Sequence, residues 1–243
     1  MKKLLAGLFL ISSIVAFSNV QKIPYEKMIT RGNSNIVYIE GQDKPFTGIV
    51  ENKFPNGKIE AKMNFKDGKL HGKTITYYEN GNMKSDENFI DGIAQGISKT
   101  FYENGQVEYE TNFKNSKREG IEKAYSKTGI LLSEVPFKDD NATGLVKLYN
   151  EQTGKLEYET SAVNGQRNGL SKKYYPSGKL LSEVTFRNDK EEGIMKGYFE
   201  NGKLQLEIPY KNGQIDGLAR RYDENGQVVE QVTFKDGQEV KTK

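Results

Sequence analysis

The sequence predicts an all-β fold: an elongated, single-layer antiparallel β-meander, built as an array of about eight hairpin units of 24 residues. Turn dipeptides of the Asn-Gly and Asp-Gly kind recur along the chain at that period. Between the turns, residues alternate in polarity with period two, and no window shows the 3.6-residue period of a helix. The period is set by glycines spaced 24 residues apart, with one interval of 25: Gly48, Gly72, Gly96, Gly120, Gly144, Gly169, Gly193 and Gly217.

The composition excludes several classes of function. The chain has 243 residues, with 36 Lys and Arg against 33 Asp and Glu, one histidine and no cysteine. Zero cysteines exclude a disulfide scaffold, a thiol nucleophile and thiolate metal sites, and one histidine leaves no His-rich metal cluster. The near balance of charge argues against nucleic-acid binding, which relies on a basic excess. Hydrophobic residues make up 35% of the chain, and this low share favours an elongated shape.

Residues 1–18 are expected to be a secretory signal peptide. Lys2 and Lys3 precede an apolar run from Leu4 to Phe17, and small residues suit a cut before Asn19. The run is shorter than the ~20 residues of a membrane span, which leaves an uncleaved anchor as the lesser alternative. No other stretch is apolar enough to cross a bilayer. The mature chain is therefore expected to be exported: periplasmic, at the cell surface or secreted.

Residues 19–47 lack the repeat and are expected to cap the array, which takes up residues 48–243. The run from Ile36 to Ile39, followed by Gly41 to Asp43, is expected to form an atypical first hairpin. Such a segment would cover the first edge of the sheet, which otherwise invites pairing with other chains. Because open sheets beyond about 10 strands curl or split, we expect a twisted ribbon.

Each unit contains a second glycine about nine residues after the first, which marks the hairpin turn. At Asn80-Gly81 and the matching dipeptides of three other units, a two-residue type I′ turn is expected, because both residues tolerate positive φ. That turn places Tyr78 opposite Met83, and it places the opening glycine Gly72 opposite the ring of Phe89. A further set of type I′ turns is expected between units, at Asp67-Gly68, Asp91-Gly92, Asn164-Gly165, Asn212-Gly213 and Asp236-Gly237.

The same register brings opposite charges face to face across each hairpin. Such cross-strand pairs contribute about 0.2–1 kcal/mol each and penalise slipped registers. The expected pairs are Lys99 with Glu110, Lys123 with Glu134, Lys172 with Glu183, and Lys196 with Glu207.

Two long runs carry a resemblance to a known family. They extend from Tyr77 to Gly92 and from Tyr198 to Gly213, and both resemble the bacterial variant of the MORN repeat. The resemblance covers residues 48 to about 237. It implies a β-hairpin array that acts in binding or scaffolding, and in other members an association with membranes or an antitoxin-like role. The sequence departs from the better-known MORN unit in having no tryptophan, and the closing His-Gly appears once, at His71-Gly72.

Enzymatic chemistry is not expected. The stretch from Gly68 to Thr74 resembles a P-loop but has three residues between its glycines where four are required. The acidic column that includes Glu110 and Glu134 recurs once per hairpin, about 9.6 Å apart, too far for a shared proton or ion. We therefore predict a non-enzymatic protein with no cofactor and no metal site.

The remaining candidate site is a surface on which lysine and tyrosine recur together. This surface could bind a protein partner, the preferred interpretation, or anionic lipid, glycan or cell-wall polymer; an immunity-like role against a toxin is a further alternative. Cross-strand stabilisation within the sheet explains the same columns without a ligand. The candidate residues are Lys123, Lys147, Lys172, Lys196, Tyr125, Tyr149, Tyr174 and Tyr198.

Units four and five are irregular. They lack aromatic residues at Ser126, Asn150 and Ala162, and unit five has one extra residue before Gly154. A local bend or a partner-specific patch over residues 126–163 is one interpretation of this irregularity, and neutral drift is the other.

Overall fold

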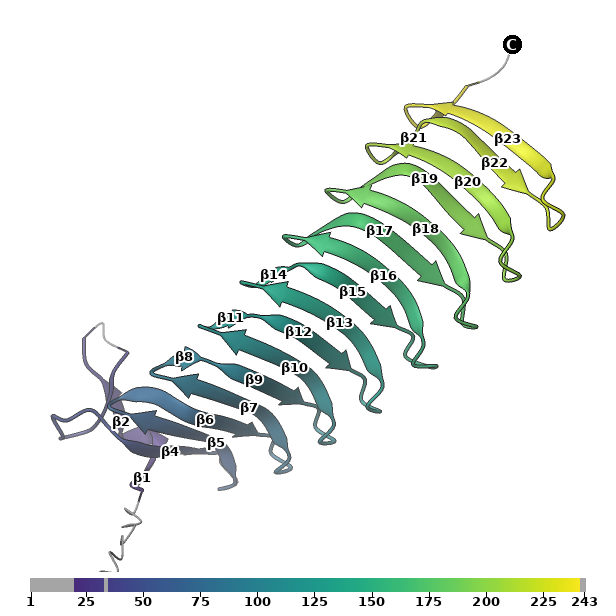
Figure 1. The fold of residues 1–243 in the computed structure, drawn as a ribbon. Helices are drawn as coiled ribbons and strands as arrows, with labels where there is room; N and C mark the ends of the chain where they lie inside the picture. Colours follow the sequence, from purple (N-terminus) through teal and green to yellow (C-terminus); the bar gives the residue numbers. More distant parts are fainter. Residues whose placement is uncertain (1–19, 33–34, 241–243) are drawn as a thin grey trace, which may run out of the picture.

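The computed structural model describes residues 20–32 and 35–240, so the expected signal peptide at residues 1–18 lies outside the described residues. The fold is all-β, as predicted. It consists of one long, mostly antiparallel sheet of 22 strands, a separate sheet of two strands and one short 3₁₀ helix. The sheet forms a single elongated layer in which successive hairpins lie side by side along the axis (Figure 1).

The elements occur along the chain in the following order. The N-terminal cap contains β1 (Lys22–Pro24), η1 (Tyr25–Lys27), β2 (Met28–Thr30) and β3 (Val37–Ile39). Units one to four contain β4 (Gly48–Lys53), β5 (Ile59–Lys66), β6 (Lys69–Tyr77), β7 (Met83–Ile90), β8 (Ile93–Ala94), β9 (Gly96–Phe101), β10 (Val107–Lys114), β11 (Lys117–Arg118), β12 (Gly120–Tyr125) and β13 (Leu131–Lys138). Units five to eight contain β14 (Asn141–Ala142), β15 (Gly144–Tyr149), β16 (Leu156–Val163), β17 (Gln166–Tyr174), β18 (Leu180–Arg187), β19 (Lys190–Tyr198), β20 (Leu204–Lys211), β21 (Gln214–Ile215), β22 (Gly217–Tyr222), β23 (Val228–Lys235) and β24 (Gln238–Glu239).

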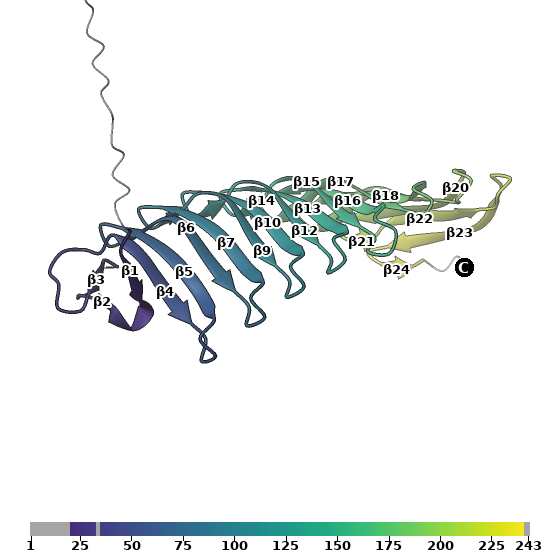
Figure 2. The ribbon, with the colours of Figure 1, turned by 90° about the horizontal axis from the view of Figure 1, so that it is seen from below.

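The cap covers the first edge of the sheet with a parallel strand, a feature that the sequence did not indicate. β1 runs parallel to β4, with Lys22 opposite Ile49. β2 and β3 pair antiparallel beside it, so the strand at residues 37–39 finds its partner upstream, with a single bridge from Tyr38 to Pro45 after the turn. The apolar residues buried here form a compact core: Ile23, Val37, Ile39, Phe46, Val50 and Phe65 (Figure 2 shows the cap at the end of the ribbon).

Turns between units, which we call inter-repeat turns, have the predicted type I′ geometry. At Asp67-Gly68 both residues have positive φ, 49° and 76°, and Lys66 lies opposite Lys69. The cap docks on this first turn: the Val37 N–H donates to the Gly68 carbonyl over 2.8 Å. A side chain at Gly68 would collide with the backbone of Val37, so glycine is required there for close approach as well as for φ. Three further inter-repeat turns reach the same geometry without glycine: Asn115-Ser116, Asp139-Asp140 and Asn188-Asp189.

Turns within units, the intra-repeat turns, are not the predicted two-residue type. At residues 78–82 only Gly81 has positive φ, its N–H donates to the Tyr78 carbonyl, and the Tyr78 N–H donates to the Asn82 carbonyl. This is a three-residue loop with glycine in the left-handed position, a hairpin connection that also matches strand twist. Tyr77, and not Tyr78, therefore lies opposite Met83.

A β-bulge next to each intra-repeat turn restores the predicted register. The pairing shifts between Thr76 and Tyr77, and beyond that shift Gly72 lies opposite Phe89 as expected. Every opening glycine is opposite the predicted residue, and in unit five that residue is Ala162. The opening glycines also have positive φ, 88° at Gly120, so the backbone bends there. Because that conformation is costly for other residues, the bend requires the glycine even without the ring.

The sheet has two unlike faces. One carries the predicted lysine–glutamate pairs and is called the ladder face. The other is called the hollow face, because buried side chains such as Ser85, Thr111, Ser171 and Phe186 gather on it. The cap covers this face at unit one, and beyond the cap no second layer of the described residues lies on it. The strands curve across their width (Figure 1), and curvature towards the hollow face accounts for this burial in a single layer.

Candidate binding surface

The ladder face carries one uninterrupted row of alternating charge that crosses the array strand by strand. Glu134, for example, lies opposite Lys123 on one side and opposite Lys147 on the other. The sequence predicted the pairs within hairpins, and the register between hairpins joins them into one ladder. In order, its members are Asp86, Lys99, Glu110, Lys123, Glu134, Lys147, Glu159, Lys172, Glu183, Lys196, Glu207 and Arg220.

Ion pairs form both within and between hairpins. Lys99 and Glu110 of one hairpin lie 3.0 Å apart. The Nζ atoms of Lys123 and Lys147 lie 4.0 and 3.9 Å from Glu134. Each ladder lysine thus has an acidic neighbour on both sides, and the row has little net charge.

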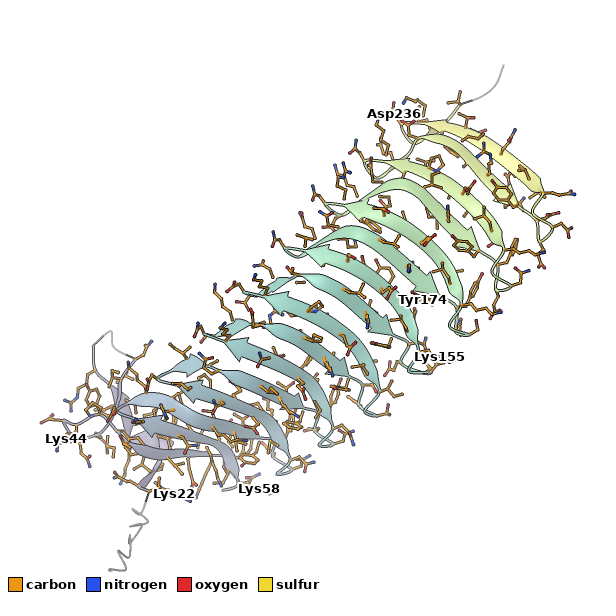
Figure 3. The ribbon with its side chains drawn as sticks, in the orientation of Figure 1. Lys22, Lys44, Lys58, Lys155, Tyr174 and Asp236 are labelled. Carbon is orange, nitrogen blue, oxygen red and sulfur yellow. The ribbon has the colours of Figure 1, made fainter. Side chains whose placement is uncertain are left out.

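The tyrosines predicted for the site lie on the same face, and three of them donate hydrogen bonds to glutamates of the ladder. The hydroxyl of Tyr174 donates to Glu159 over 2.7 Å, and Figure 3 shows Tyr174 at the end of β17 near an intra-repeat turn. Tyr149 and Tyr198 donate in the same way to the glutamate fifteen residues earlier. Burial, and then the hydrogen bond to glutamate, raises the pKa of all three phenols to about 12. Tyr125 lies opposite Leu131 in the corresponding position of unit four.

All eight predicted residues therefore share one face, as the sequence indicated. Their polar groups are largely engaged with glutamates of the sheet, which is what cross-strand stabilisation requires. Figure 3 also separates the two rows of turns: Lys58 and Lys155 lie along one long edge, and Asp236 lies along the other.

A row of exposed aliphatic side chains runs beside the ladder, and sequence reasoning missed it. Each member lies two residues before a ladder lysine and therefore on the same face. Ile97, Ile121 and Ile194 are 57%, 53% and 54% exposed. The signal was in the sequence as an apolar residue one position after the opening glycine. The full row is Ile97, Ile121, Leu145, Leu170 and Ile194, and we call it the aliphatic row.

The hollow face contains several depressions. One of about 630 Å³ spans units five to seven, next to Arg167, whose guanidinium stacks 3.9 Å from the centre of the Phe186 ring. Beneath it the buried hydroxyls of Thr160 and Ser171 lie 2.5 Å apart. Ala162, where the phenylalanine column is interrupted, is only 6% exposed, so the missing ring leaves no open gap there.

The described residues, 20–32 and 35–240, limit the possible kinds of site in two ways. Within these ranges no group of three or more His, Asp or Glu side chains is placed to hold a metal ion. No helix in the same part of the chain is long and apolar enough to span a membrane.

Comparison with known proteins decides the family. The MORN repeat variant matches seven segments: residues 46–67, 70–91, 94–115, 118–139, 167–188, 191–212 and 215–236. The chain belongs to the MORN repeat variant family. Unit five falls in the gap between the fourth and fifth matches, which agrees with its irregular sequence.

Solved structures and curated proteins add little to this assignment. The chain aligns with the Photorhabdus luminescens Tc holotoxin pore (TccC3 D651A) at 11% identity and a TM-score of 0.20, covering 84% of this chain and 13% of that one. It aligns with the TcdB2-TccC3-TEV structure at 12% identity and a TM-score of 0.17, covering 82% and 13%. The chain thus spans about an eighth of the length of these proteins. Among curated proteins, none matches.

Proposed function

We propose that this MORN repeat protein is a non-enzymatic binding protein, exported to the cell envelope or beyond it, whose ladder face docks on a protein partner. The observation that carries the proposal is the aliphatic row. Five half-exposed Ile and Leu side chains stand on one face, at the spacing of the repeat. Repeated apolar residues on an open surface are typical of protein–protein contacts.

The ladder favours a protein over an anionic lipid or wall polymer. A surface that attracts polyanions needs an excess of Lys and Arg. Here every ladder lysine stands between two carboxylates, as Lys123 does between Glu110 and Glu134. A row of alternating charge instead selects the register of a partner that carries its own pattern of charge.

Affinity capture tests the proposal. The bait is the chain from residue 19, and its variant carries Ile121→Ser, Leu145→Ser and Leu170→Ser on the aliphatic row. We expect one protein from envelope or supernatant fractions to bind the wild type in stoichiometric amount and to be lost with the variant. The control carries Val135→Ser on the opposite, hollow face. Equal capture by all baits, or capture of lipid or wall material alone, would contradict the proposal.

A further inference from the structure

Another depression, which we call the cap hollow, lies where the cap meets the first intra-repeat turns. Aromatic and acidic residues line it. Its volume is about 660 Å³. Tyr25 comes from η1 and is 45% exposed, and Phe54 and Tyr78 come from the turns of units one and two. The carboxylates that line it are Glu60, Glu79 and Glu103, and the only lysine among the lining residues is Lys84.

Equivalent rings elsewhere in the array indicate what such a site accepts. The ammonium of Lys84 lies 5.8 Å from the centre of the Tyr78 ring, and that of Lys127 lies 5.9 Å from the centre of the Tyr102 ring. These lysines come from two different positions of the repeat: six residues after the ring, in the bulge, and 25 residues after it, in the next turn. We call the rings at this turn position the turn rings: Phe54, Tyr78, Tyr102, Tyr175 and Phe199. At two of them, Tyr78 and Tyr102, a lysine of the chain itself covers the ring.

Phe54 is the ring at which both positions are acidic. Glu60 stands six residues after it and Glu79 stands 25 residues after it. Tyr175 and Phe199, the other two turn rings, each have one glutamate at these two positions. The unit-one ring thus has two carboxylates and no lysine at these positions, and Tyr25 of the cap adds a further aromatic ring to the hollow.

Lys58, in the same turn as Phe54, is held by a backbone carbonyl and is not among the lining residues of the hollow. The Lys58 ammonium donates to the Glu79 backbone carbonyl over 2.9 Å. Lys203 does the same to the Glu224 carbonyl in a later unit, over 2.6 Å, so this contact belongs to the repeat and joins adjacent turns. Glu60 accepts a hydrogen bond from the Asn52 amide over 2.7 Å, which holds its carboxylate in place at the hollow.

We propose that this hollow binds a basic side chain, lysine or arginine, of a partner polypeptide. The aromatic faces of Tyr25 and Phe54 attract the cation through their ring quadrupoles, and Glu60 and Glu79 neutralise its charge. The bound group takes the place that Lys84 and Lys127 fill at the next two rings. The partner is that of the proposed function, but the hollow is separate from the ladder face and can be tested without it.

The test uses small peptides as probes and the chain from residue 19. N-acetyl-lysine N-methylamide, its arginine counterpart and its norleucine counterpart are titrated, and NMR follows the ring signals of Tyr25, Phe54 and Tyr78. We expect saturable shifts with the lysine and arginine probes, and binding about tenfold weaker with norleucine, which has the apolar stem without the charge. Equal shifts with norleucine, or ring signals that do not move, would overturn the proposal.

Two variants locate the site. Glu60→Lys places an ammonium at the position equivalent to Lys84, so the hollow becomes occupied by the chain itself and the lysine probe should no longer bind. Glu60→Gln with Glu79→Gln keeps the shape of the hollow and should weaken the lysine probe about tenfold. The matched control is Glu200→Gln, at the same turn position of a distant unit, and it should bind as the wild type does.

The outcomes separate this site from the proposed function. Unchanged lysine binding by folded Glu60→Lys refutes the hollow as a cation site. It leaves the ladder face unaffected, because the capture variant changes no residue of the hollow.

Discussion

At the scale of single residues, half-buried tyrosines of the ladder face donate their hydroxyl hydrogen bonds to glutamates of the ladder. Tyr149, Tyr174 and Tyr198 each donate to a glutamate of the preceding unit, and their pKa rises to about 12. The neutral phenol is the form that can donate this bond. Ionisation would place a negative charge beside a carboxylate.

These shifts predict a loss of stability in alkali. The folded pKa of about 12 lies above the ordinary value of about 10, so the stabilisation is complete below about pH 10 and is lost as the pH rises through 12. We expect the melting temperature to fall between pH 10 and pH 12 by more in the wild type than in a triple variant with Phe at the three positions. Thermal denaturation across this pH range measures the fall in melting temperature, and phenolate absorbance measures the ionisation of the tyrosines.

The triple Phe variant also serves as the control, because it keeps every other charged group of the array, so any loss of stability that it shares with the wild type has another cause. If the two proteins lose stability in parallel, the tyrosine–glutamate bonds do not account for the loss.

At the scale of elements, the hairpin shows which parts of the fold the sequence could specify. The register expected from a two-residue turn placed Gly72 opposite Phe89 and Lys123 opposite Glu134, and both pairings are confirmed. The type of the intra-repeat turn was wrong, because Asn-Gly suits a type I′ turn and a three-residue loop equally well. The bulge that compensates adds one residue on one strand, so the error vanished two residues from the turn.

Other features depended on contacts that no local pattern reports. The aliphatic row was readable from residues such as Ile97, but its exposure follows only from the described fold, in which no second layer covers the ladder face. The parallel pairing of β1 with β4, and the arrival of Tyr25 beside Phe54, depend on how the cap docks. Inter-repeat turns such as Asp139-Asp140 lack the glycine that usually marks them.

The ladder predicts a strong response to one charge reversal. Glu134→Lys would place three ammonium groups on adjacent strands, because Lys123 and Lys147 lie on either side. It also removes the acceptor of the Tyr149 hydroxyl. We expect a loss of about 1–2 kcal/mol in stability at low salt, and a smaller loss in 1 M NaCl. Urea unfolding at both salt concentrations measures it.

Glu134→Gln is the matched control for this reversal. It removes the attraction without adding repulsion, and should cost less than Glu134→Lys at low salt. A reversal that is as stable as the wild type would mean that the ladder contributes nothing to the array.

At the scale of the whole molecule, the protein is a single open sheet. One end of the array is covered by the cap, whose core includes Val50 and Phe65 of unit one. Beyond the cap each unit contacts mainly its neighbours, as in other repeat proteins, so stability builds up along the axis. Beyond the cap, no second layer of the described residues covers either face, which leaves room for a partner on the ladder face and at the hollow beside the cap.

Small-angle X-ray scattering combined with light scattering, on residues 19–243, measures whether the sheet is open and whether the chain is a monomer. The eight hairpins occupy sixteen strand positions, because a short strand such as β8 shares a position with the strand that follows it. At about 4.8 Å per position the axis is about 77 Å long, so we predict a radius of gyration of about 25 Å at the mass of one chain. A compact chain of this length would give about 17 Å. A value near 17 Å would contradict the open sheet. A mass twice that of one chain would mean that the protein pairs with a second copy. The ladder face would then not be free for another partner.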